Sequence, residues 1–153
     1  MNMIRNCAIL LVVALAILAS ADGAMAAQPS KPKVSEPPHI TQFDTAAKAV
    51  CEGLPGCDFA LLNGDPKSGP TQWFFRLKAG TAFPRHWHST PENMVAIRGR
   101  LTFNFESGQK HTLVPGEHLR YQAGMIHWGQ CEADADCLFY VFNDRPYDFN
   151  LAE

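Results

Sequence analysis

The sequence lacks three features that would each indicate a broad class of protein. It has no excess of basic residues, because 13 Lys and Arg stand against 15 Asp and Glu, and no basic run follows the N-terminal region. This balance argues against a nucleic-acid surface. The sequence also shows no internal repeat and no second domain. Finally, it has no apolar run of the roughly 20 residues that a membrane-spanning helix needs.

The longest apolar run, residues 7–19, covers only 13 residues. It follows the positively charged stretch MNMIRN and precedes small residues that include an A-x-A site at 24–26. This three-part pattern predicts a secretory signal peptide over residues 1–26, and no membrane association after cleavage. The remaining 153 − 26 = 127 residues suit one domain of common size, in a periplasmic or secreted protein.

Export changes the interpretation of the cysteines. After removal of the signal peptide four remain, and an even count in an oxidising compartment favours disulfides. Four cysteines allow three pairings, but Cys51 and Cys57 enclose five residues of turn-forming composition, as do Cys131 and Cys137. We therefore expect two local bridges, Cys51–Cys57 and Cys131–Cys137. A zinc cluster of all four thiolates is the alternative, although the close C-x2-C spacing is absent.

The secondary structure is expected to be almost entirely β. Residues 27–40 are rich in proline and read as an extended lead-in, and residues 43–51 form the only helix candidate after the signal peptide. From Asp58 onward, seven or more short apolar or alternating runs are separated by Gly and Pro. This pattern predicts an all-β sandwich or barrel. Arg98-Gly99, between two of these runs, suggests a tight hairpin turn.

A candidate metal site lies in the stretch GTAFPRHWHSTPENMVAIRG, residues 80–99. On a strand, His86 and His88 point to the same side and Trp87 to the other. Glu92 follows a Ser-Thr-Pro turn, so a strand–turn–strand arrangement brings its carboxylate to the same side. Two imidazoles and a carboxylate in an apolar interior are costly unless they bind something, and a divalent metal is the usual partner.

These residues resemble the first signature motif of the cupin superfamily, G-x5-H-x-H-x3-E-x6-G. Gly80, His86, His88, Glu92 and Gly99 fill every position of that motif. The resemblance implies a single-domain cupin fold, a double-stranded β-helix or jelly-roll barrel, over residues 41–153. It is specific, because five fixed positions match without a gap. The chain is more narrowly similar to small secreted single-domain cupins, most of which have no defined function.

The second cupin motif is matched with two departures. GEHLRYQAGMIHWGQC supplies Gly116, Gly124 and His127 at the expected spacing. Gln122 stands where proline is usual, and Cys131 stands where asparagine is usual. Cys131 is therefore either a thiol near the metal or half of a structural bridge, and export favours the bridge. The metal ligands that the resemblance implies are His86, His88, Glu92 and His127.

The chemistry of this ligand set permits several functions. Three imidazoles and one carboxylate suit Mn, Fe, Co, Ni, Cu or Zn, and an octahedral ion would keep two positions open. We expect a metal-dependent enzyme for a small oxygenated metabolite: an oxygenase, decarboxylase, isomerase or lyase. The alternative is a non-catalytic ligand-binding or metal-sensing module. Catalytic residues are undetermined, with Arg76, Tyr140 and Gln122 as weak candidates, because runs that are apolar on both faces do not show which side chains point inward. The resemblance also suggests a homodimer.

Overall fold

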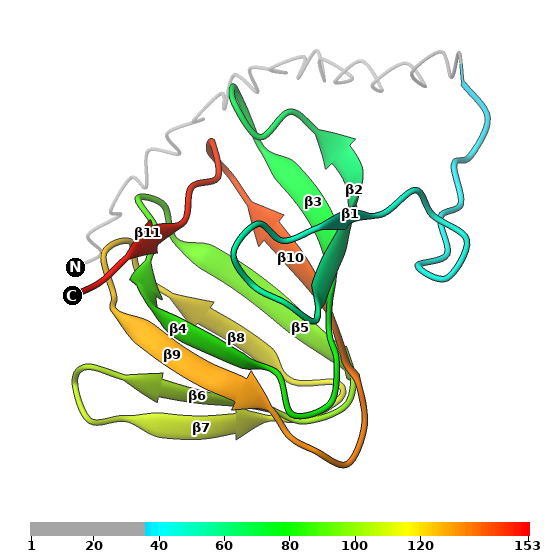
Figure 1. Cartoon of the computed structure of the whole chain (residues 1–153). Helices are drawn as coiled ribbons and strands as arrows, with labels where there is room; N and C mark the ends of the chain where they lie inside the picture. Colours follow the sequence, from blue (N-terminus) through cyan, green and yellow to red (C-terminus); the bar gives the residue numbers. More distant parts are fainter. Residues whose placement is uncertain (1–35) are drawn as a thin grey trace, which may run out of the picture. The chain divides into compact units, whose positions relative to one another are not determined.

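The computed structural model describes residues 36–153, and the expected signal peptide lies outside this range. The described residues form eleven strands in two antiparallel sheets (Figure 1). The six-stranded sheet has the order β1-β2-β3-β10-β5-β8, with β1 Ala49–Val50, β2 Cys57–Gly64, β3 Thr71–Leu77, β10 Cys137–Asn143, β5 Glu92–Arg98 and β8 His118–Tyr121. The five-stranded sheet has the order β11-β4-β9-β6-β7, with β11 Asn150–Leu151, β4 Ala82–Trp87, β9 His127–Cys131, β6 Leu101–Phe105 and β7 Lys110–Leu113.

The core lies between the inner faces of the two sheets. On β10, buried and half-buried residues alternate along the whole strand, so that Phe139 and Val141 point inward while Tyr140 points outward. Aromatic residues from both sheets dominate this core, including Trp73 on β3 and Phe103 on β6. The all-β jelly-roll prediction is therefore confirmed. Within residues 36–153 there is no helix long and apolar enough to cross a membrane.

The helix expected over residues 43–51 is wrong. The chain makes a turn at 43–45 and then enters β1, which pairs with β2. Nine residues with a few alanines carry too little intrinsic propensity to offset the cost of helix nucleation. Tertiary contacts therefore decide the conformation: Phe43 is 5% exposed and packs edge-on against Phe74 of β3, with ring centroids 6.3 Å apart.

The turn at Gly99 also differs from the expectation. β5 and β6 do not form a hairpin, because β5 belongs to the six-stranded sheet and β6 to the five-stranded sheet. Gly99 has φ +74°, and a Cβ at this position would lie 2.6 Å from the carbonyl oxygen of Asp136. Glycine is therefore required at this position for two reasons: the positive φ, and the close approach of a neighbouring chain segment.

Two disulfides are present among the described residues, with the pairings that the cysteine spacing predicts. Cys51 and Cys57 have Cα atoms 5.3 Å apart, and Cys131 and Cys137 have Cα atoms 5.8 Å apart. The second bridge is buried and joins the end of β9 to the start of β10. It therefore links the two sheets at a point four residues beyond His127.

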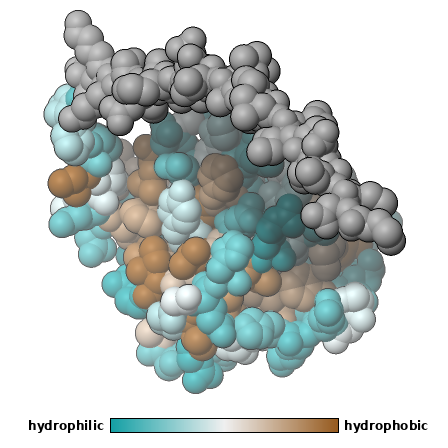
Figure 2. All heavy atoms as spheres, turned by 180° about the vertical axis from the view of Figure 1, so that it is seen from behind, coloured by the Kyte–Doolittle hydropathy of each residue, from teal (hydrophilic) through white to brown (hydrophobic). Residues whose placement is uncertain are grey.

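The surface of the described region is mixed in character. Figure 2 shows hydrophobic residues scattered among hydrophilic ones on the face seen from behind. A few large apolar side chains are well exposed, among them Val50 at 79% and Leu151 at 69%. Both lie on short two-residue strands at the outer edges of their sheets, where little of the chain is available to cover them.

Candidate metal centre

The predicted ligand residues lie at or next to strand ends from both sheets. His86 is the fifth residue of β4, His88 follows the end of that strand, Glu92 begins β5 and His127 begins β9. His86 and His127 face each other as a register pair on adjacent strands. All four side chains are buried, whereas Trp87 is only half-buried. The alternation of β4 therefore directs both of its histidines inward, as the sequence pattern predicts.

The three histidines converge and have a common orientation. One ring nitrogen of each lies within 4.8 Å of those of the other two. The other ring nitrogen of each contacts a backbone carbonyl: His86 Nδ1 to Pro84 O at 2.8 Å, His88 Nδ1 to Asp148 O at 2.5 Å, and His127 Nδ1 to Met125 O at 2.9 Å. Because a carbonyl oxygen only accepts, each Nδ1 carries the proton and donates. In the neutral rings every Nε2 is then unprotonated and can turn a lone pair toward the cluster, although that of His127 also accepts a hydrogen bond from Tyr121.

Glu92 completes the group and introduces an electrostatic conflict. Its Oε2 lies 2.9 Å from Nε2 of His88, and the two side chains are only 6% and 2% exposed. This oxygen nevertheless has no aligned hydrogen-bond partner. A neutral His88, protonated on Nδ1, would point its Nε2 lone pair at an ionised carboxylate. Only a cation between them, either a proton or a metal ion, removes this repulsion.

The pKa values of the cluster reflect the same competition between burial and charge. Burial, reinforced by the neighbouring His127, lowers the pKa of His86 to about 3. Burial also lowers the pKa of His127. Burial acts against the charged forms of His88 and Glu92 too, but their mutual attraction prevails, so the pKa of His88 is raised and that of Glu92 is lowered. Burial therefore favours the unprotonated, ligating forms of His86 and His127, whereas His88 holds its proton more strongly beside Glu92.

Tyr121 is a site residue that sequence reasoning missed. It ends β8, is paired in register with Glu92, and its hydroxyl donates to Nε2 of His127 over 3.0 Å. Burial, together with the charge of Glu92, raises its pKa well above the usual value, so that the hydroxyl stays protonated. The available signal was its position in the second cupin motif, six residues before His127 and next to Gln122.

The C-terminal segment also belongs to the site, and no motif pointed to it. The Asp148 carbonyl holds His88, and the Asp148 carboxylate accepts hydrogen bonds from both the backbone N–H and the hydroxyl of Ser89. The ring of Phe149 stacks on His86 with centroids 4.2 Å apart and an interplanar angle of 22°. About sixty residues of chain separate these partners, which is why local spacing could not reveal the contacts.

The cluster opens into a cavity of about 520 Å³ that is lined by residues of both sheets and by the loop of the first disulfide. Aromatic side chains form much of its wall. Phe75 and Phe139 lie nearly parallel there, with centroids 5.8 Å apart and an interplanar angle of 10°. The volume is within the range of pockets that bind small molecules.

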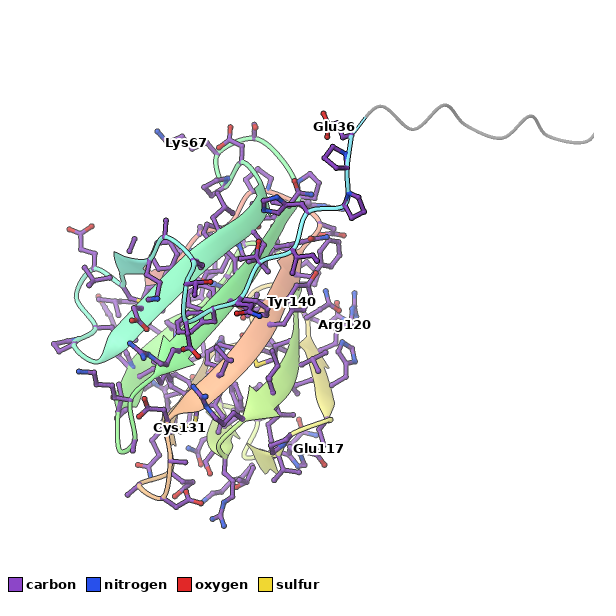
Figure 3. The ribbon with its side chains drawn as sticks, turned by 90° about the vertical axis from the view of Figure 1, so that its right-hand side faces the viewer. Glu36, Lys67, Glu117, Arg120, Cys131 and Tyr140 are labelled. Carbon is purple, nitrogen blue, oxygen red and sulfur yellow. A yellow bond between two sulfur atoms is a disulfide. The ribbon has the colours of Figure 1, made fainter. Side chains whose placement is uncertain are left out.

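None of the three weak catalytic candidates lines this cavity among the described residues. Arg76 forms an ion pair with Asp58 on the opposite side of β3 from the inward-facing Trp73 and Leu77. Tyr140 lies over β10 on the outer face of the six-stranded sheet (Figure 3). Gln122 is exposed immediately after β8. The structure therefore brings the four expected ligands together and leaves these three candidates outside.

Comparisons with known proteins support this architecture. Residues 73–143 match the family described as Cupin domain. Among curated proteins, DNA damage-repair/toleration protein DRT102 from Arabidopsis thaliana is 31% identical over 101 residues, which cover 65% of this chain and 31% of that protein. The chain thus spans about a third of the length of this relative.

Solved structures show the same fold at low identity. The polyketide cyclase RemF from Streptomyces resistomycificus has a TM-score of 0.65 at 15% identity, covering 75% of this chain and 85% of its own. A cupin-superfamily sugar phosphate isomerase from Silicibacter pomeroyi has a TM-score of 0.58 at 23% identity, covering 70% and 76%. The motifs, the fold and the family match agree, and this chain carries a cupin domain that is matched over residues 73–143.

Proposed function

We propose that this cupin is an exported, metal-dependent enzyme that acts on a small oxygenated metabolite. The observation that carries the proposal is the orientation of the histidines. Each Nδ1 donates to a backbone carbonyl, so that three Nε2 lone pairs converge beside the buried carboxylate of Glu92. A donor set of three neutral imidazoles and one carboxylate fits a divalent transition metal, and the uncompensated Oε2 of Glu92 supports a cation at this place.

The protein would supply orientation, while the ion would supply Lewis acidity toward an oxygen of the substrate. The carbonyls of Pro84, Asp148 and Met125 fix the three rings. The Tyr121 hydroxyl, kept protonated by burial, is placed to donate a hydrogen bond to an oxygen that enters the cluster. The aromatic walls exclude water from the reacting groups. Enzymes among the structural neighbours, a cyclase and an isomerase, support a catalytic role for the fold.

Export is supported by the disulfides. Two bridges in one small domain are typical of oxidising compartments and rare in the cytosol. The predicted signal peptide over residues 1–26 would direct the chain there. We therefore place the mature protein in the periplasm or the extracellular space.

A non-catalytic module for ligand binding or metal sensing is the second candidate. It is favoured by the scarcity of proton-transfer groups: apart from the expected ligands, the described cavity residues offer only Glu52 and two tyrosines. Turnover assays on small hydroxy acids, catechols and enols with the native metal would separate the two candidates. Binding without any turnover would favour the module.

The first test is metal content, measured by mass spectrometry on the full-length protein matured in its own compartment. We expect about one ion per chain, as one mixed nitrogen and oxygen site implies. The His88→Ala variant should lose it. His118→Ala is the matched control, because His118 is exposed on β8 and absent from the cluster, and it should keep the ion. A metal-free wild-type protein would refute the metal-dependent proposal.

A further inference from the structure

The cavity has a polar end and an apolar end. The polar end contains the three histidines, Glu92 and Tyr121. The rest of the described lining is mainly aromatic and aliphatic, with side chains such as Trp73, Phe75 and Leu77. Of residues 36–153, no Lys, Arg, Ser, Thr, Asn or Gln lines this cavity. Such a lining is unusual for a site that has to recognise a charged or polyhydroxylated compound.

This lining argues against several kinds of ligand. A phosphate or a carboxylate remote from the metal would need Arg or Lys, and a sugar would need partners for many hydroxyl groups. The one other carboxylate of the lining, that of the exposed Glu52, would repel an anion. The indole N–H of Trp73 is also unavailable, because it already donates to Thr71 Oγ1 over 2.8 Å.

The same lining suits a flat, apolar ring. Phe75 and Phe139 stack on each other across β3 and β10, and the ring of Tyr147 lies 6.3 Å from that of Phe75, so the three rings form one aromatic wall. Aromatic rings pack well against such surfaces, through stacked or edge-to-face contacts. A planar ligand that reaches from this wall to the histidines would therefore bury its ring and keep its polar atoms at the metal end.

The charge of the polar end limits how many of those polar atoms are ionised. A divalent ion contributes two positive charges, the carboxylate of Glu92 contributes one negative charge, and neutral histidines contribute none. The sum of one positive charge is balanced by one ionised oxygen of the ligand. A second anionic group would be buried without a partner, which is costly in an apolar cavity.

We propose that the ligand is a planar, conjugated compound with oxygen atoms on two neighbouring carbon atoms. One of these oxygens is ionised when the compound is bound, and the compound has no other charged group. Alkyl-substituted catechols and enolised 1,2-diketones have this chemistry. The two oxygens would take the open positions of the ion, and the ring would lie against the aromatic wall. This inference rests on the proposed metal site and narrows the class of substrate that the site accepts.

The test uses two probes that differ in a single group. 4-Methylcatechol and 3,4-dihydroxybenzoate share the same pair of oxygens, but a methyl group in the first is a carboxylate in the second. Full-length protein loaded with Zn²⁺, which does not oxidise catechols, is titrated with each probe by calorimetry. We expect 4-methylcatechol to bind at least about tenfold more tightly, and fructose 6-phosphate to show no saturable binding.

A variant tests the reason for this preference. Leu151 lines the cavity, is 69% exposed and lies opposite His86 in register, so that Leu151→Arg adds a cation near the site without disturbing the core. The variant should narrow the gap between the two probes by strengthening the binding of 3,4-dihydroxybenzoate. Ile97→Arg is the matched control, because it adds the same charge at an exposed position outside the cavity lining, and it should keep the wild-type preference.

Zinc content measured before the titration separates the two proposals. A protein that takes up no zinc contradicts the metal site itself. With about one zinc per chain, three outcomes would each overturn the substrate class alone: no binding of 4-methylcatechol, equal affinity for the two probes, or tighter binding of the carboxylate or the sugar phosphate.

Discussion

Two histidine–glutamate pairs in this domain have nearly the same contact distance but very different surroundings. His88 Nε2 lies 2.9 Å from Glu92 Oε2, and His111 Nε2 lies 3.0 Å from Glu117 Oε2. The side chains of the first pair are 2% and 6% exposed, whereas those of the second are 51% and 42% exposed. Distance alone therefore does not distinguish a candidate metal site from a surface contact.

The two pairs differ in whether each side chain has another group, water or protein, to interact with in place of its partner. Water solvates both members of the exposed pair, and the pKa of Glu117 is lowered first by the backbone N–H of Val114 and only then by His111. The buried pair has no such alternative. His88 is fixed by the Asp148 carbonyl, and Oε2 of Glu92 has no aligned donor, so a cation is needed between them. Burial with fixed orientation turns an ordinary contact into a cation site.

The largest effect is expected from Glu92→Gln. Loss of the carboxylate should weaken metal binding by at least about 10- to 100-fold, because that range already applies to groups that only orient the ligands of a metal. The metal-free variant should be less stable than the wild type near neutral pH, because the attraction that raises the pKa of His88 and lowers that of Glu92 is lost. Melting curves in chelator and in excess Zn²⁺ measure both effects. Glu117→Gln, the same change in the exposed pair, should alter neither. If Glu92→Gln melted higher than the wild type in chelator, repulsion rather than attraction would dominate the metal-free buried pair.

The second prediction concerns pH. In the metal-free protein the pKa of His88 is raised above 6.5, whereas those of His86 and His127 are lowered. His88 is therefore the imidazole that must release a proton when a metal binds below its raised pKa. Metal affinity should rise with pH, by up to about tenfold per unit well below that pKa, and level off above it. Zn²⁺ titrations at several pH values give this slope. A slope of two or three would mean that His86 or His127 is also protonated.

The third prediction tests how the buried pair is held. Asp148→Ala keeps the backbone carbonyl that accepts from His88 but removes the carboxylate that anchors Ser89. Metal affinity should fall by up to about tenfold, because the ring of His88 is then less well fixed. Asp144→Ala is the matched control, since Asp144 is exposed in the same segment. Equal affinities for the two variants would show that the C-terminal segment does not position the ligand.

The sequence predicted the parts of this arrangement that depend on local spacing. Strand alternation placed His86 and His88 on one side, and the second motif supplied His127 at the right distance. The resemblance to cupins then implied the fold. The contact that fixes the ring of His88 and the ring that stacks on His86 could not be predicted in this way, because the carbonyl of Asp148 and the ring of Phe149 reach the site from the C-terminal segment.

Some predictions failed because the local pattern was ambiguous. The strands that carry Arg76 and Tyr140 are apolar on both faces, so the alternation could not show that both residues point outward. The helix expected over residues 43–51 rested on a few alanines, and packing of Phe43 on Phe74 outweighed that propensity. At Gly99 the motif required glycine, but only the sheet topology shows that the turn passes the chain between sheets.

The smallest effect is expected from breaking the exposed pair with His111→Ala. Metal content and Zn²⁺ affinity should equal those of the wild type, because His111 lies outside the cluster. The melting temperature should be unchanged at high salt, where the attraction between solvated charges is screened. Melting curves at low and high salt, together with a Zn²⁺ titration, provide the check. A loss of metal affinity would mean that an exposed side chain on β7 influences the buried cluster. Burial and orientation alone would then not explain the difference between the two pairs.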